Sequence, residues 1–134
     1  MQKVSDAYLL NLLREVVSIR AGGKCEFPGC NKVICDPHHI FSRDNKSVRY
    51  DKENIANLCD YHHRWAEAHR DDFVTVMIGW RGEKWWDDLV IRKNIIIKFN
   101  GNFRQDWKEK LLGEKAALTE SNKTIEVIKR YQAA

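Results

Sequence analysis

The fold is decided by residues 24 to 70, which read KCEFPGCNKVICDPHHIFSRDNKSVRYDKENIANLCDYHHRWAEAHR. This stretch holds four potential metal ligands in two halves: Cys25 and Cys30 around a Pro-Gly turn, then Cys59 and His62 after an intervening segment. Thiolate and imidazole groups at such spacings suit a closed structural zinc site, in which the free energy of metal binding becomes free energy of folding. The sequence therefore predicts one structural Zn²⁺ held by these four side chains.

The remaining cysteine has two interpretations. Cys35 could replace His62 as the fourth ligand, but its place in the apolar run Val33-Ile34-Cys35 favours a small buried residue. The alternative for the whole set is a group of buried cysteines without a metal, which is common in protein cores. Disulfides are not expected, because the sequence opens without a secretory apolar segment and a cytoplasmic compartment keeps thiols reduced.

A second set of polar residues is interleaved with these ligands. It comprises the histidine pair His38-His39, then Asn54, then His63. In this order and spacing, together with the two halves of the zinc site, these residues resemble the HNH, or ββα-metal, nucleases. The resemblance covers about residues 24 to 70. It implies a zinc-stapled ββα-metal core and a metal-dependent endonuclease that hydrolyses DNA phosphodiester bonds in phage or bacterial DNA processing or recombination.

The resemblance assigns a role to each of these residues. His39 falls on the general base, a role that suits an imidazole, whose pKa near ~6.5 lets it take a proton from attacking water at neutral pH. His38 and His63 fall on the ligands of a catalytic divalent ion (Mg²⁺, Mn²⁺, Ni²⁺ or Zn²⁺) that would stabilise negative charge growing on phosphate oxygens. Asn54 falls on the central asparagine, which would hold the loop and orient the base.

The sequence departs from the family pattern at two places. The second zinc half is Cys59-x2-His62 where many members have two cysteines, so a mixed Cys3His site is required, which is chemically acceptable. The third protein ligand of the catalytic ion is open between two residues. Glu67 shares a helix face with His63 at i, i+4, whereas His69 offers imidazole chemistry.

The histidine pair raises a geometric condition. Adjacent side chains on a regular strand point to opposite faces, so His38 and His39 can serve one site only if the strand ends or distorts there. Pro37 favours such a distortion because it removes a ladder donor. The alternative for the pair taken alone is two ordinary surface histidines.

Basic residues are candidates for nucleic-acid contact. Arg43, Lys46 and Arg49 lie in the predicted loop of residues 42–49, where a phosphodiester would have to pass, although a solvated loop is the competing interpretation. The formal net charge of +4 is mild, and residues 92–134 carry ten Lys and Arg against five Asp and Glu. This balance permits a phosphate-backbone partner. We expect the aromatic cluster to pack in the core rather than stack on bases; it comprises Trp80, Trp85, Trp86 and Trp107.

The expected fold class is α+β, in a single domain with three parts. Residues 1–23 form an N-terminal helix capped by Ser5, residues 24–70 form the zinc-bound nuclease core, and residues 71–134 form a helical C-terminal extension. Strands are predicted at 33–35 and 39–41. Helices are predicted at 61–69, 72–77 and 83–91, from Phe103 to an interruption at Gly113, and near residues 125–131.

Other functions compete with the nuclease. A non-catalytic zinc-containing nucleic-acid-binding module would keep the scaffold, but the presence of His39, Asn54 and His63 together favours an enzyme. A toxin domain like the colicin nucleases shares the motif, but the moderate charge favours a free-standing enzyme. The longest non-helical apolar run is far below the ~20 residues that span a bilayer. We therefore expect a cytoplasmic protein of a bacterial cell or phage-infected host, with duplex or branched DNA as partner and the oligomeric state open.

Overall fold

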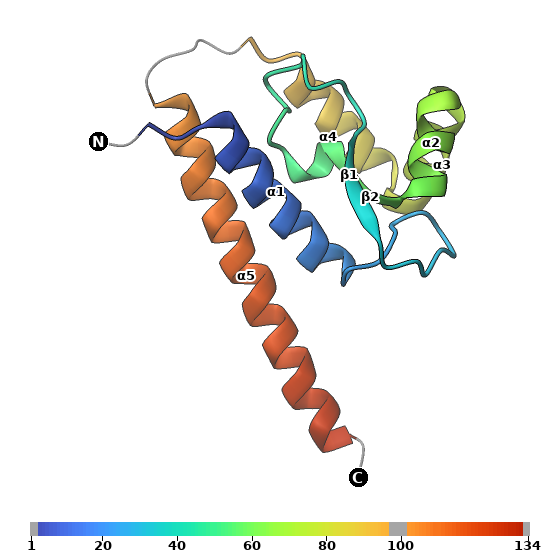
Figure 1. Cartoon of the computed structure of the whole chain (residues 1–134), viewed down its shortest axis with the longest axis vertical. Helices are drawn as coiled ribbons and strands as arrows, with labels where there is room; N and C mark the ends of the chain where they lie inside the picture. The colour runs from blue at the N-terminus through green and yellow to red at the C-terminus, as the bar shows by residue number, and fades with distance from the viewer. Residues whose placement is uncertain (1–2, 97–101, 133–134) are drawn as a thin grey trace.

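The computed structural model describes residues 3–96 and 102–132, which form five α-helices and one two-stranded antiparallel sheet. The α+β class is therefore confirmed. In chain order the elements are α1 (Asp6–Ala21), β1 (Cys35–His39), the 3-10 turn η1 (Lys52–Asn54), β2 (Ile55–Cys59), α2 (Asp60–Ala68), α3 (Arg70–Arg81), α4 (Glu83–Lys93) and α5 (Phe103–Gln132). Helix α1 packs against α5 on one side and against the sheet on the other (Figure 1).

Helix α1 forms as its sequence predicts. The hydroxyl of Ser5 accepts a hydrogen bond from the backbone N–H of Tyr8 at 3.0 Å, which satisfies a donor of the first turn. Gly22 ends the helix at a φ of 62°, a conformation that glycine adopts without strain. The apolar stripe is buried against β2 and α5; it comprises Leu9, Leu12, Leu13, Val16 and Val17.

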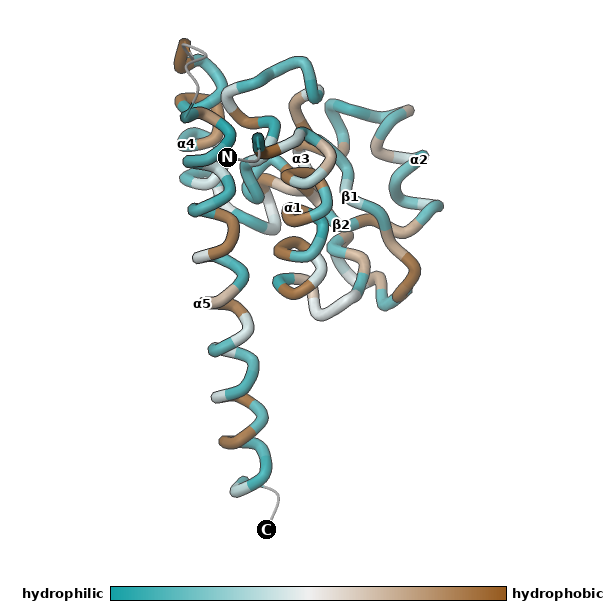
Figure 2. The backbone as a smooth tube through the Cα atoms, turned by 60° about the vertical axis from the view of Figure 1, so that its left-hand side comes forward, coloured by the Kyte–Doolittle hydropathy of each residue, from teal (hydrophilic) through white to brown (hydrophobic). Residues whose placement is uncertain are grey.

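Helix α5 is longer than the sequence indicates. Gly113 does not interrupt it, so the helix expected near residues 125–131 is the end of a single 30-residue element. A helical glycine costs about 1 kcal/mol relative to alanine, which packing of the neighbouring Leu111 and Trp107 against α1 offsets. In Figure 2 the last turns of α5 extend past the other helices and are largely hydrophilic.

The sheet differs most from the predictions. Strand β1 pairs with β2 in the register Cys35↔Cys59 to His39↔Ile55, whereas Ile34 lies outside the sheet and is 87% exposed. The predicted strands at 33–35 and 39–41 were therefore misplaced, and β2 was not predicted. Pro37 lies inside β1, where a proline is tolerated because the strand has one neighbour. The pairing runs without a bulge through Pro37 and ends at His39.

Helices α2 and α3 cover the face of the sheet opposite α1. Their buried side chains meet Leu58 of β2 in a second core that contains Phe73 and Met77. Trp85 packs against this core and its Nε1 donates a hydrogen bond to the Glu53 carbonyl at 3.0 Å. The prediction of core packing is wrong for Trp80, which is 64% exposed on α3. Among the described helices, none is long and apolar enough to cross a membrane.

Candidate metal centres

The first candidate centre joins two segments that lie far apart in the sequence. Cys25, Cys30, Cys59 and His62 bring their ligand atoms within 4.8 Å of one another. The Nδ1 atom of His62 lies 3.3 Å from the Sγ atom of Cys59 and 3.6 Å from that of Cys25, and the Sγ atoms of Cys30 and Cys59 are 3.9 Å apart. These four residues are the predicted structural set, and their arrangement could hold a metal ion.

A tight turn and the junction of β2 with α2 bring the four side chains together. The backbone N–H of Cys30 donates to the Phe27 carbonyl at 3.0 Å, and Gly29 takes a φ of 82° in this tight turn. Cys59 ends β2 and His62 stands in the first turn of α2. The ring of Phe27 stacks on that of His62 at 4.0 Å, which fixes the imidazole between the two halves.

The Cys25 thiol is buried at this centre. Burial raises the pKa of the Cys25 thiol to about 12, because a thiolate without a positive partner is poorly solvated there. A bound cation would supply the missing charge and displace the thiol protons. Cys35 lies outside the group: it is half-buried, and its Sγ donates to the Lys32 carbonyl at 3.4 Å.

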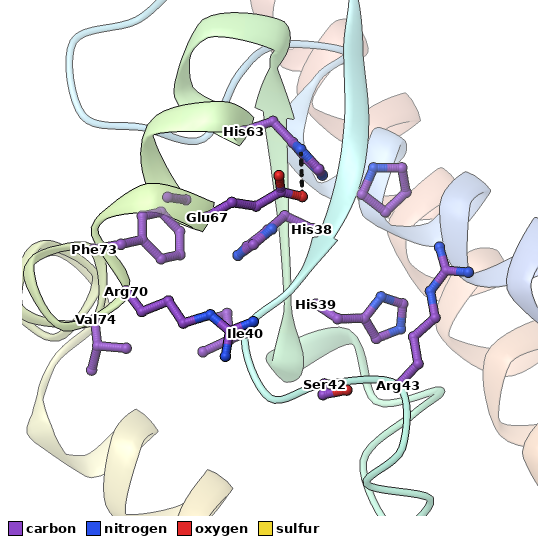
Figure 3. A pocket seen from close by; sticks show the side chains of 12 residues that line it. His38, His39, Ile40, Ser42, Arg43, His63, Glu67, Arg70, Phe73 and Val74 are labelled. Carbon is purple, nitrogen blue, oxygen red and sulfur yellow. Dashed lines mark ion pairs between the residues drawn. The ribbon is translucent and has the colours of Figure 1, made fainter.

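The second candidate centre lies where β1 faces α2. His38, His63 and Glu67 bring their ligand atoms within 4.8 Å of one another. The Nδ1 atom of His63 is 3.3 Å from an Oε1 atom of Glu67 one helical turn later, and the ring centroids of His38 and His63 are 5.0 Å apart. Figure 3 shows the three side chains converging in one cleft.

The environment of His38 suits metal binding. Its ring packs edge-on against Phe73, with centroids 5.3 Å apart. Burial above all, together with the neighbouring His63 and His39, lowers the pKa of His38 to about 4. The imidazole is therefore neutral at neutral pH, with a nitrogen lone pair available to a cation.

Of the two residues considered for a third ligand, the structure brings only Glu67 to this centre. Glu67 lies one turn after His63 on α2, so both side chains share a face. His69 lies beyond the end of α2, where its ring stacks on Trp65 and its Nδ1 atom is 3.1 Å from the Trp65 carbonyl oxygen. The geometry thus favours Glu67 over His69 as the third ligand, a choice that sequence spacing alone could not make.

A cleft of about 390 Å³ contains this centre and is also lined by His39. Strand β1 ends at His39, so the histidine pair meets the condition set by strand alternation. In Figure 3 the His39 ring lies across β1 from the group formed by His38, His63 and Glu67. The cleft reaches both sides of the strand end, and one cavity therefore contacts both histidines.

A hydrogen bond fixes the tautomer of His39. Its Nε2 atom lies 2.9 Å from the carbonyl oxygen of Arg49. Because a carbonyl oxygen only accepts, Nε2 carries the hydrogen, and Nδ1 of the neutral ring keeps a lone pair. Burial lowers the pKa of His39, partly opposed by this hydrogen bond, so the neutral form predominates at neutral pH.

Asn54 is fully buried, and both the oxygen and the nitrogen of its side-chain amide form hydrogen bonds. Its Oδ1 atom accepts from the backbone N–H of Phe41 at 2.7 Å, and its Nδ2 atom donates to the carbonyls of Phe41 and Val48 at 3.0 and 3.2 Å. These bonds close the loop that carries Arg43 and Arg49. The amide faces the backbone rather than the cleft.

The three basic candidates of the loop occupy different environments. Arg43 is exposed and lines the cleft. Lys46 lies farther along the loop and lines a separate pocket with Arg104. Arg49, expected to contact phosphate, is engaged by Asp6 through bonds of 2.9 and 2.7 Å and therefore ties the loop to α1.

Sequence reasoning missed one basic residue of the cleft. Arg70 lines it beside His38, Glu67 and Phe73. It is the first residue of α3, so its position depends on the turn between α2 and α3. A regular spacing from His63 could not reveal this placement, because the two residues belong to different helices.

Comparisons with protein-family models, curated proteins and solved structures gave no match to this chain.

The geometry predicts different consequences for two half-buried cysteines. Replacement Cys30→Ser removes a ligand of the first centre, so the metal content should fall by about one ion per chain and the melting temperature should drop. Replacement Cys35→Ser removes a thiol outside the group and should leave the metal content unchanged. Elemental analysis of the purified variants, with thermal unfolding followed by circular dichroism, measures both. Equal metal loss in the two variants would contradict the assignment.

Proposed function

We propose that the chain is a zinc-stapled, metal-dependent endonuclease of the HNH, or ββα-metal, type that hydrolyses phosphodiester bonds in DNA. One observation carries the proposal. His38, His63 and Glu67 converge in a cleft that is also lined by His39, whose ring is held in a single tautomer by the Arg49 carbonyl. A metal-ligand group and an oriented base in one cavity are the parts that metal-assisted hydrolysis requires.

The first centre fits structural zinc. Two thiolates bound to a tetrahedral Zn²⁺ at about 2.3 Å stand about 3.8 Å apart, and the Sγ atoms of Cys30 and Cys59 are 3.9 Å apart. Three cysteines and one histidine leave no position for substrate in a four-coordinate site. We assign this centre a folding role, in which it fastens the turn at Cys25 to the start of α2.

The second centre fits a catalytic divalent ion. Two imidazoles and a carboxylate are suitable ligands for such an ion, and Glu67 is 59% exposed, which leaves the centre open to solvent and substrate. Mg²⁺, Mn²⁺, Ni²⁺ and Zn²⁺ are the candidates. When bound, the ion would supply positive charge to the phosphate oxygens on which negative charge grows during hydrolysis.

The side chains around the cleft take the roles of general base, positioning residue and phosphate contact. The Nδ1 atom of His39 accepts the proton of the water that attacks phosphorus. Asn54 positions this base indirectly, because it holds the loop whose Arg49 carbonyl fixes the His39 ring. Arg43 and Arg70 bring positive charge to the cleft and attract the DNA backbone.

Removal of the base tests the activity directly. Replacement His39→Ala should lower the rate of cutting of supercoiled plasmid by roughly 10²-fold or more, the range that general bases contribute. The matched control is His69→Ala, an exposed histidine outside the cleft, which should cut at the wild-type rate. Both variants are assayed with Mg²⁺, Mn²⁺ and Ni²⁺ after their zinc content is shown to be intact.

Two outcomes would contradict this proposal. Wild-type cutting that persists in a zinc-loaded His39→Ala protein would remove His39 from the mechanism. If the wild type cuts no plasmid, branched or single-stranded DNA with any of these metals, the catalytic claim fails. A zinc-containing nucleic-acid-binding module then becomes the better account.

The third ligand gives a separate prediction. Replacement Glu67→Gln removes the carboxylate from the second centre, so the concentration of Mn²⁺ that gives half-maximal cutting should rise at least about tenfold, within the range found when groups that support a metal site are removed. His69→Ala should leave this concentration unchanged. Metal titrations of the cutting rate measure the difference. A rise in His69→Ala with none in Glu67→Gln would reverse the assignment.

A further inference from the structure

A second pocket lies on the α1 side of His39. Its volume is about 270 Å³, and it shares Pro37, His39 and Arg43 with the cleft that holds the second metal centre. Its other wall is the face of α1 that carries Asn11 and Arg14, three residues apart on the helix. His39 therefore stands between two cavities that continue past the end of β1.

The chemistry of this pocket matches a nucleotide unit of a nucleic-acid backbone. Arg14 and Arg43 supply two guanidinium groups, and Asn11 supplies an amide that can donate or accept. The apolar part of the lining comes from Ala7, Leu10, Leu13 and Pro37. Guanidinium groups bind phosphate in a bidentate manner, and an apolar wall suits the carbon face of a sugar.

Arg14 is held in a bond that a phosphate can replace. Its Nη1 atom donates to an Oδ1 atom of Asp36 at 2.8 Å, and the two side chains are 56% and 72% exposed. Water screens such a pair, so it contributes little to stability. A backbone phosphodiester carries the same single negative charge as the carboxylate, and it could accept two parallel hydrogen bonds from the guanidinium where Asp36 accepts one from Nη1. Asp36 then acts as a competing anion beside the pocket.

We propose that this pocket binds the backbone phosphate of a nucleotide next to the scissile one, with Arg14 and Arg43 as its contacts and Asp36 as the anion that competes with it for Arg14. The inference rests on the proposed nuclease function. A strand whose scissile phosphate lies in the cleft continues past His39 into this pocket, because the two cavities share that wall. Helix α1 thereby gains a substrate-binding role in addition to its place in the core.

Replacing the two partners of the Arg14–Asp36 ion pair should change the affinity for DNA in opposite directions. Replacement Arg14→Ala should weaken binding of a fluorescent 20-base-pair duplex about tenfold and reduce the slope of log Kd against log salt by about one, since one phosphate contact is lost. Arg14→Lys keeps the charge and should keep the slope. Asp36→Asn removes the competitor and should tighten binding about threefold. Anisotropy titrations of zinc-loaded protein without added divalent ion measure these values.

A matched pair controls for loss of a surface charge. Lys84 and Asp88 form an exposed ion pair of 2.8 Å on α4, outside both cavities. Lys84→Ala and Asp88→Asn should leave Kd unchanged within about twofold. If the Arg14–Asp36 bond served only to hold α1 against β1, Arg14→Ala and Asp36→Asn would shift Kd in the same direction.

The outcomes separate this inference from the function on which it rests. Wild-type cutting of plasmid, together with an unchanged Kd in Arg14→Ala or shifts of equal sign in the two variants, would overturn the pocket and leave the nuclease intact. Absence of any cutting by the wild type would overturn the nuclease and the pocket with it. In steady-state cutting, the expected result for Arg14→Ala is a raised KM with kcat near the wild-type value.

Discussion

Backbone hydrogen bonds between β1 and β2 place both groups of candidate metal ligands, because β2 continues without a loop into α2. The register sets His38 opposite Ala56 and Cys35 opposite Cys59, and α2 begins at the next residue. The pairing of β1 with β2 therefore places His62 beside the thiols of Cys25 and Cys30, and it places His63 beside His38. Strands of five residues bring few hydrogen bonds of their own, so the arrangement depends on packing of the buried β2 between α1 and the helices α2 and α3.

A half-buried ion pair fastens α1 to this assembly. The guanidinium of Arg20 donates to Glu26 in the turn that carries Cys25 and Cys30, and to the carbonyls of Lys52 and Ile55 at 2.6 and 2.9 Å. Glu26 in turn accepts from the backbone N–H of Asn57 in β2 at 2.8 Å. The end of α1, the turn and β2 thus share one network, in which each charged group has partners that offset the cost of its burial. Loss of one partner would disturb the first candidate metal centre and the strand together.

The sequence predicts those features that depend on local patterns. The capped helix α1, the set Cys25, Cys30, Cys59 and His62, and most of the later helices follow from spacing and turn residues. Strand β2 was missed because Ile55–Cys59 is buried at every position and shows no alternation, so periodicity does not reveal it. The ion pair of Arg49 with Asp6 was not predicted because the two residues lie 43 positions apart in the sequence. Sequence spacing does not reveal contacts between residues that lie far apart in the chain. For the same reason the sequence did not predict that Arg70 lines the cleft or that a pocket lies on α1.

The central claim is that DNA meets a divalent ion at His38, His63 and Glu67. The most direct measurement is anomalous X-ray diffraction from crystals of the zinc-loaded protein with Mn²⁺ and an uncleaved DNA duplex. The account predicts a manganese peak among these three side chains, with a backbone phosphate beside it and within reach of His39. It also predicts a zinc peak at the Cys3His group. DNA bound on another face, or no manganese between β1 and α2, would contradict the account.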